Sequence, residues 1–181
     1  MHRMLFICFW TLGIGLLLTG PATAQPRFSD VTAQATATAI FFSRSIAFGD
    51  YDNDGWPDLF LKQNGIDQFR LLHNEGDGRL GNQTFKLLPE DLPRSTQSGP
   101  TDNSGGALFG DYDNDGDLDL FVPLRGQNRL LRNDRGRFID VGVAAGLLDS
   151  LKTDNATWLD YDRDGDLDLY TLTGANITQI F

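Results

Sequence analysis

Short apolar segments separated by polar turns run through most of the chain. Three lead into an acidic stretch and three lead out of one, at residues 46–48, 107–109 and 156–158 and at residues 59–61, 118–122 and 167–172. Each is shorter than an ordinary helix and is bounded by Gly, Asn or Asp, which is typical of β-strands. The segment 118–122 would place apolar side chains on both of its faces. This pattern predicts strands that are buried between neighbouring sheets.

Other segments recur together with the acidic stretches. RFSDV at 27–31 and RFIDV at 137–141 each begin 23 residues before an acidic stretch, and TFKL at 84–87 takes the comparable place before the remaining one. RLLHN at 70–74 corresponds to RLLRN at 129–133. One repeat is therefore predicted to contain an RFxDV strand, an apolar strand, the acidic loop, a second apolar strand and an RLLxN strand.

The acidic stretches begin at Asp50, Asp111 and Asp160, so they are separated by 61 and 49 residues. Such spacings are typical of propellers and solenoids. We predict an all-β fold, namely a β-propeller of four-stranded blades, of which about three are present as a partial propeller. The repeat region spans 25–181, with approximate units at 27–82, 83–135 and 136–181.

The three acidic stretches share one ligand pattern. They read DYDNDGWPD at 50–58, DYDNDGDLD at 111–119 and DYDRDGDLD at 160–168, with Asp at positions 1, 3, 5 and 9 and Gly at position 6 in every copy. Carboxylates arranged around a glycine turn are the oxygen ligands that a hard cation such as Ca²⁺ prefers. Positions 4, 7 and 8 vary, as expected for spectators, and a residue at position 7 that offers its backbone carbonyl is free to vary. We interpret the constant Tyr at position 2 as a packing residue.

An EF-hand begins in a similar way but needs a glutamate at position 12 and flanking helices. Position 12 is Leu61, Val122 or Thr171 here, and the flanks have the pattern of strands. The sequence therefore disfavours an EF-hand.

A DxDxDGxxD loop between strands, repeated at this interval, resembles the FG-GAP or VCBS repeat of integrin α-like β-propellers. The RFxDV and RLLxN segments are similar to those of extracellular proteins in which such repeats precede an ASPIC/UnbV domain. The resemblance covers about residues 27–181 and implies a propeller with Ca²⁺ held in about three loops. The carboxylate ligands that it implies are Asp50, Asp52, Asp54, Asp58, Asp111, Asp113, Asp115, Asp119, Asp160, Asp162, Asp164 and Asp168. The backbone carbonyls that it implies are those of Trp56, Asp117 and Asp166.

Charge and composition narrow the functional classes. The formal net charge is -10, and 14 of the 25 acidic residues lie inside the three loops. This acidity argues for cations as partners and against nucleic acid or anionic membranes. Paired carboxylates also occur in glycosidases, but those enzymes need one carboxyl with a raised pKa, whereas a bound metal would lower it. We therefore expect no enzymatic activity.

The first 24 residues have the features of a signal peptide. Arg3 supplies the positive start, an uncharged apolar stretch follows from residue 5 to 18, and ATA at 22–24 is a small-x-small cleavage site. The apolar run is short for a membrane span, so we expect cleavage before Gln25 rather than an anchor. The mature chain would lack cysteine, since Cys8 lies in the leader, and would keep one histidine, His73, which we interpret as a surface strand residue. The expected location is secreted, periplasmic or at the cell surface.

The sequence leaves three hypotheses for the function. The first is an exported, calcium-binding propeller segment that acts as a binding or adhesion scaffold for extracellular protein or carbohydrate. The second is the non-catalytic propeller portion of a longer extracellular enzyme. The third is a short protein that oligomerises to close its ring, because a closed propeller needs further blades or another chain.

Overall fold

The computed structural model describes residues 27–35, 43–63, 69–90, 92, 105–124, 126–147, 152–174 and 178–180. The chain divides into two compact units, Met1–Asp30 and Val31–Phe181. In the first unit only residues 27–30 are described, and they form no regular element. The predicted signal peptide at 1–24 lies outside the described residues. All the sheets belong to the second unit, and neither helix in the described part of the chain has the length and apolarity that crossing a bilayer requires.

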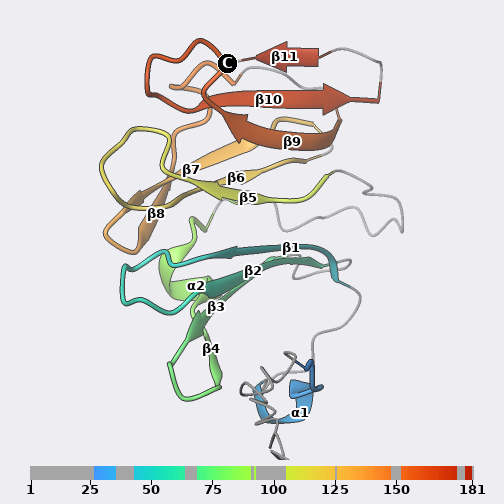
Figure 1. Cartoon of the computed structure of the whole chain (residues 1–181). Helices are drawn as coiled ribbons and strands as arrows, with labels where there is room; N and C mark the ends of the chain where they lie inside the picture. The colour runs from blue at the N-terminus through green and yellow to red at the C-terminus, as the bar shows by residue number, and fades with distance from the viewer. Residues whose placement is uncertain are drawn as a thin grey trace, which may run out of the picture. The chain divides into compact units, whose positions relative to one another are not determined.

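The first sheet is an antiparallel meander with its strands in chain order (Figure 1). Its strands are β1 (Ser43–Gly49), β2 (Asp58–Gln63), β3 (Phe69–Asn74) and β4 (Leu80–Asn82). The first acidic loop joins β1 to β2, and the register places Phe48 opposite Leu59 and Leu59 opposite Leu72. The predicted lead-in, lead-out and RLLxN strands are therefore confirmed in this repeat.

The second sheet repeats this topology. Its strands are β5 (Leu108–Gly110), β6 (Asp119–Val122), β7 (Arg129–Asp134) and β8 (Arg137–Asp140). The RFIDV segment forms β8 and pairs with the preceding RLLRN strand, with Leu131 opposite Asp140. The predicted units assign the RFIDV segment to the third repeat, whereas the structure places β8 in the second sheet. A tight turn after β7 lets β8 pair with β7 and complete this sheet.

The third sheet contains three described strands. They are β9 (Thr153–Leu159), β10 (Asp168–Thr173) and β11 (Thr178–Ile180), with β10 in the middle. The short β11 takes the place that β3 and β7 hold in the other sheets, where the sequence offered no RLLxN motif. The prediction of an all-β, partial propeller is confirmed at this level, since the molecule consists almost entirely of blade-like antiparallel sheets.

Two expected strands are wrong. The residues of RFSDV at 27–31 form no strand, and Phe28 is fully exposed; the short helix α1 (Thr32–Ala35) follows them. TFKL at 84–87 forms a helical turn, α2 (Thr84–Leu87), whose first residue is buried and accepts a hydrogen bond from Leu71 N at its Oγ1. The fourth position of the first sheet is already taken by β4, so the TFKL segment has no free strand edge there.

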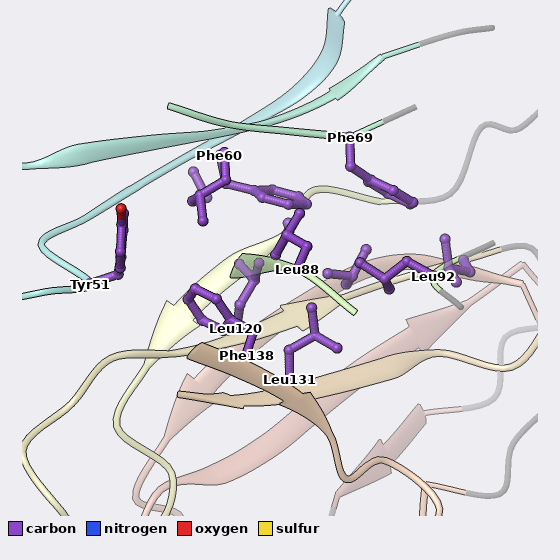
Figure 2. Close-up of a cluster of buried hydrophobic side chains, with 13 residues drawn as sticks. Tyr51, Phe60, Phe69, Leu88, Leu92, Leu120, Leu131 and Phe138 are labelled. Atoms are coloured by element: carbon purple, nitrogen blue, oxygen red, sulfur yellow. The ribbon is translucent and has the colours of Figure 1, made fainter. Parts of the chain in front are cut away.

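Large apolar side chains fill the space between the first two sheets (Figure 2). Phe60 lies in this cluster and stacks on Phe69, with ring centroids 5.8 Å apart. Leu120 and Val122 enter the same cluster from β6, whereas Phe121, one residue apart, enters the cluster between the second and third sheets. The strand β6 is therefore buried on both faces, as its sequence predicts.

The first strands of neighbouring sheets pack closely against each other, which places the acidic loops side by side. β5 lies beside both β1 and β9. A Cβ on Gly49 would lie 2.6 Å from Cγ of Phe109, and one on Gly110 would lie 2.6 Å from Cδ1 of Trp158. Each glycine precedes an acidic loop, and the aromatic ring that covers it precedes the next loop. This repeated contact places neighbouring loops side by side.

Replacing Phe121 measures how much the packing between the second and third sheets contributes to stability. The side chain is fully buried between the second and third sheets. We expect Phe121→Ala to lower the free energy of unfolding by about 3–5 kcal/mol, because it removes apolar contacts and leaves a cavity. Urea unfolding monitored by circular dichroism measures this loss. Phe48→Ala, at a ring that is 65% exposed, is the control and should cost far less; equal losses would contradict the assigned packing.

Candidate metal centre

The three acidic loops share one backbone path. Position 4 has a left-handed conformation in each, with φ of 58° at Asn53, 58° at Asn114 and 66° at Arg163. The glycine at position 6 has φ of 91°, 91° and 99° in the three loops. Non-glycine residues rarely adopt such values, and asparagine does so more often than most. The constant glycine therefore has a backbone reason, independent of any ligand.

The aspartate at position 1 closes each of the first two loops. Oδ1 of Asp50 accepts from Asp54 N at 3.1 Å, and Oδ2 accepts from Gly55 N at 2.8 Å. Asp111 makes the same two bonds with Asp115 N and Gly116 N, both at 3.0 Å. These bonds turn the amides of positions 5 and 6 toward the first carboxylate and wrap the loop around it.

The aspartate at position 5 closes a smaller turn. Its Oδ1 accepts from the backbone N of position 7 at 2.8 Å in the first loop and at 2.9 Å in the second and third. Asp54, Asp115 and Asp164 thus each use one oxygen to shape the loop. The other oxygen makes no hydrogen bond to a described backbone amide, and that of Asp54 lies 3.8 Å from Nε2 of His73.

The aspartate at position 9 joins the loop to the sheet. Asp58 and Asp119 are fully buried. Their Oδ2 atoms accept from the backbone N of the position 2 tyrosines, at 3.1 and 3.0 Å, and their Oδ1 atoms accept from Asn74 N and Asn133 N, both at 2.8 Å. Asp168 repeats the bond to its tyrosine, from Tyr161 N at 2.7 Å. In the first two repeats, position 9 therefore connects the loop, the second strand and the third strand.

Burial makes the carboxylates of these loops hard to ionise. Desolvation raises the pKa of Asp119 to about 6, although hydrogen bonds from Asn133 N and Tyr112 N oppose the shift. Burial likewise raises the pKa values of Asp58, Asp52 and Asp113, and neighbouring aspartates add to the shift. A nearby cation would favour the charged forms and reverse these shifts.

Ligand atoms converge in every loop. Oxygens or nitrogens that lie within 4.8 Å of one another come from Asp50, Asp52 and Asp54; from Asp111, Asp113 and Asp115; from Asp160, Asp162 and Asp168; and from Asp52, Asp58 and His73. The first three sets consist of carboxylate oxygens alone. This donor chemistry fits a hard cation such as Ca²⁺. Asp119 and Asp164 belong to none of these four groups.

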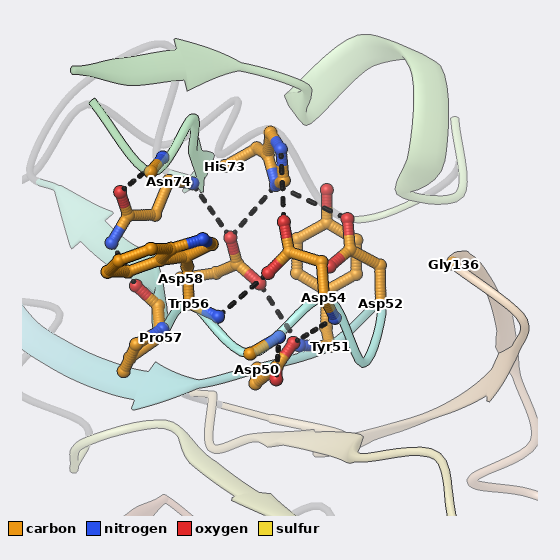
Figure 3. Close-up of polar contacts among 12 residues, drawn as sticks. Asp50, Tyr51, Asp52, Asp54, Trp56, Pro57, Asp58, His73, Asn74 and Gly136 are labelled. Atoms are coloured by element: carbon orange, nitrogen blue, oxygen red, sulfur yellow. Dashed lines mark hydrogen bonds and ion pairs between the residues drawn. The ribbon is translucent and has the colours of Figure 1, made fainter. Parts of the chain in front are cut away.

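His73 lies against the first loop, contrary to its interpretation as a surface strand residue. Its side chain is 18% exposed, and its Nδ1 lies 3.1 Å from Oδ1 of Asp58 and 3.3 Å from Oδ2 of Asp52 (Figure 3). Arg132 holds the corresponding position in the second repeat, where its charge opposes part of the rise that burial and the neighbouring aspartates cause in the pKa of Asp113. The shared basic character of these two residues in RLLHN and RLLRN was the signal in the sequence.

Positions 4 and 7, which the sequence presents as spectators, connect one loop to the next. Nδ2 of Asn53 donates to Oδ1 of Asp117 at 2.8 Å and to Gly116 O at 3.2 Å. Nδ2 of Asn114 donates to Oδ1 of Asp166 at 2.7 Å. The two outer loops differ: position 7 of the first loop is Trp56, and position 4 of the third loop is Arg163. The side chain of position 7 therefore serves the neighbouring loop, while the predicted ligand role of its carbonyl stays a prediction.

The tyrosines at position 2 differ in their burial. Tyr51 is 3% exposed and packs against Phe138 of the second sheet, with ring centroids 5.8 Å apart. Tyr161 of the last loop is 65% exposed. Packing is thus the role of the tyrosine where a following sheet covers it.

Each of the three blade-like antiparallel sheets carries an acidic loop between its first two strands, which is the arrangement of a repeated propeller blade. Residues 111–171, from the second acidic loop into β10, match the model of the FG-GAP-like repeat family. The chain therefore carries an FG-GAP-like repeat, as its sequence predicts. No curated protein matches the chain at a significant level.

The buried position 9 carboxyls predict a pH dependence in the absence of divalent cations. The pKa of Asp119 is raised to about 6 from an unfolded value of about 3.9, so the folded state favours the protonated form. Its stabilising contribution is complete below the unfolded pKa and is lost as the pH rises through the folded one. We expect the free energy of unfolding in EDTA to fall between about pH 4 and pH 7, as measured by urea unfolding.

Asp119→Asn should reduce this decrease in the free energy of unfolding, because asparagine does not ionise in this pH range. Asp134→Asn is the matched control, since Asp134 is exposed and the hydrogen bond from Arg132 lowers its pKa. Its contribution is instead lost as the pH falls. Identical pH profiles for the native chain and Asp119→Asn would contradict the role assigned to this carboxyl.

Proposed function

We propose that the three acidic loops bind Ca²⁺ and that the sheets form an exported, non-catalytic scaffold that binds extracellular protein or carbohydrate. The observation that carries the calcium proposal is the convergence of carboxylate oxygens within 4.8 Å in all three loops. The FG-GAP-like repeat at residues 111–171 supports a propeller-type binding scaffold.

The loops need a counter-charge to be stable in their ionised form. Each holds four or five carboxylates within nine residues, and burial already raises the pKa of several of them. A bound Ca²⁺ supplies two positive charges and crosslinks the oxygen ligands of the loop. The ligands would be the aspartates of positions 1, 3, 5 and 9 and the backbone carbonyl of position 7. Because such ligands are assembled only in the folded chain, calcium binding would stabilise the fold.

Export supplies the calcium that these loops require. Extracellular calcium modules typically bind with dissociation constants of about 10⁻⁴–10⁻³ M, close to calcium concentrations outside cells. The proposal of export rests on the leader-like residues 1–24. N-terminal sequencing of the protein recovered after expression with an active secretion pathway should begin at Gln25; recovery of an intact residue 1 would contradict cleavage.

The partner surface is proposed from the family resemblance and from the ends of the array of sheets. Leu172 and Ile180 of the third sheet are 43% and 45% exposed, and Ile46 and Phe48 of the first are 55% and 65% exposed. Since a closed propeller has four or more blades, we propose that further blades or another chain complete the ring.

Calcium dependence of stability tests the proposal directly. We expect EDTA to lower the melting temperature of the full chain by many degrees and millimolar Ca²⁺ to restore it, because the cation binds the folded state. Differential scanning calorimetry measures both effects. A melting temperature that is indifferent to EDTA and Ca²⁺ would overturn the proposal for all three loops.

A single-loop variant assigns the effect to a site. Asp111→Asn removes a position 1 carboxylate and should reduce the number of calcium ions bound by one, as measured by isothermal titration calorimetry. Asp134→Asn, which removes an exposed aspartate that pairs with Arg132 outside the loops, should leave the number unchanged. The opposite ranking of these variants would show that the second loop is not the site.

A further inference from the structure

We propose that Asn53 and Asn114 are positioning residues that couple calcium binding in neighbouring loops, each acting through the position 7 aspartate of the next loop. This inference rests on the proposed calcium binding. Its basis is the pair of amide-to-carboxylate bonds that cross between repeats, at 2.8 Å to Asp117 and 2.7 Å to Asp166.

The donor end of each link depends on the fold of its own loop. Asn114 lies between the position 3 and position 5 aspartates, in the left-handed conformation at φ of 58°. The flanking bond from Asp115 N to Asp111 closes the loop around it. The amide of Asn114 therefore points toward the third loop only while the second loop keeps this conformation. A cation bound in the second loop would hold Asn114 in its donating position.

The acceptor end determines the backbone of the next loop. Oδ1 of Asp166 accepts from Asn114, while the backbone N of Asp166 donates to Asp164 at 2.9 Å. The bond from Asn114 thus holds the residue whose backbone carbonyl is the implied fifth ligand of the third loop. It also gives the carboxylate of Asp166 a neutral donor, so that this charge has a partner outside the cluster.

The first and second loops are linked more extensively. Asp117 accepts from Asn53 at Oδ1 and from Arg135 N at Oδ2, at 2.8 and 3.1 Å. Nδ2 of the buried Asn133 also donates to Tyr51 O at 2.6 Å and to Leu118 O at 3.1 Å. The carbonyls that share this amide belong to position 2 of one loop and position 8 of the next. Both links would transmit order between the loops in either direction, as thermodynamic reciprocity requires.

The experiment measures coupling between the second and third loops by a double-mutant cycle in the ¹⁵N-labelled full chain. The backbone amide signals of Gly55, Gly116 and Gly165 each report one loop during a Ca²⁺ titration. Asp111→Asn disables the second loop. We expect it to weaken calcium binding at Gly165 about fivefold or more when Asn114 is present. With Asn114→Gly, the same change should alter binding at Gly165 by less than about twofold.

The choice of variants separates the side chain from the backbone and from charge. Glycine accepts the left-handed conformation, so Asn114→Gly removes the amide without strain. Asn114→Asp keeps the shape but replaces the donor with a carboxylate that repels Asp166, and it should also abolish the coupling. The charge lost in Asp111→Asn is the same in every background, so the cycle subtracts its long-range effect.

Arg163→Gly is the matched control. Arg163 occupies the same left-handed position in the third loop, and within the described part of the chain it makes no bond to another loop. Its replacement should retain the fivefold effect of Asp111→Asn. The coupling would be overturned if Asp111→Asn changed calcium binding at Gly165 equally with and without Asn114. It would also be overturned if Asp111→Asn had no effect on Gly165 in the native chain; in both cases the proposed calcium binding itself would stand. If calcium moves none of the three glycine signals, the proposed function itself fails.

Discussion

The buried aspartate at position 9 is the constraint on which the loops and sheets jointly depend. Asp58 and Asp119 accept bonds from the loop that precedes them and from the strand β3 or β7, so one carboxylate fixes three segments. A buried ionisable group is costly unless it is paired, and here backbone amides satisfy it only in part, since the pKa of Asp119 stays raised to about 6. A nearby cation would favour the charged form of the same residue that organises the blade.

Strand positions and the carboxylate pattern were predictable because they depend on local chemistry. The lead-in and lead-out strands follow from short apolar runs beside Gly and Asp, and the strand β6 is buried on both faces as its residues imply. The failures concern segments whose structure depends on neighbours. RFSDV and TFKL resemble the β8 sequence, yet β4 already fills the fourth place of the first sheet. A repeat in sequence thus identifies equivalent residues without specifying which sheet each strand joins.

The site shows the same division between local and long-range information. Positions 1, 5 and 6 could be read from one loop, because their hydrogen bonds and backbone angles lie within it. The roles of His73 and of positions 4 and 7 depend on packing between segments 15 to 64 residues apart. Variation at positions 4 and 7 looked like absence of function. The variation instead marks the first and last loops. Trp56 at position 7 of the first loop and Arg163 at position 4 of the third loop make no inter-loop bond among the described residues.

The three loops are consequently similar in ligands and unequal in surroundings. The first has an imidazole against Asp52 and Asp58, the second is linked to loops on both sides, and the third has an exposed tyrosine and a position 4 arginine. The packing of Phe109 on Gly49 and of Trp158 on Gly110 brings the loops close enough for side-chain amides to cross between them. Close approach of highly acidic loops would otherwise be repulsive. The charge-assisted hydrogen bonds from Asn53 and Asn114 offset part of that repulsion. The contact that packs the sheets together therefore also lets neighbouring acidic loops bond to one another.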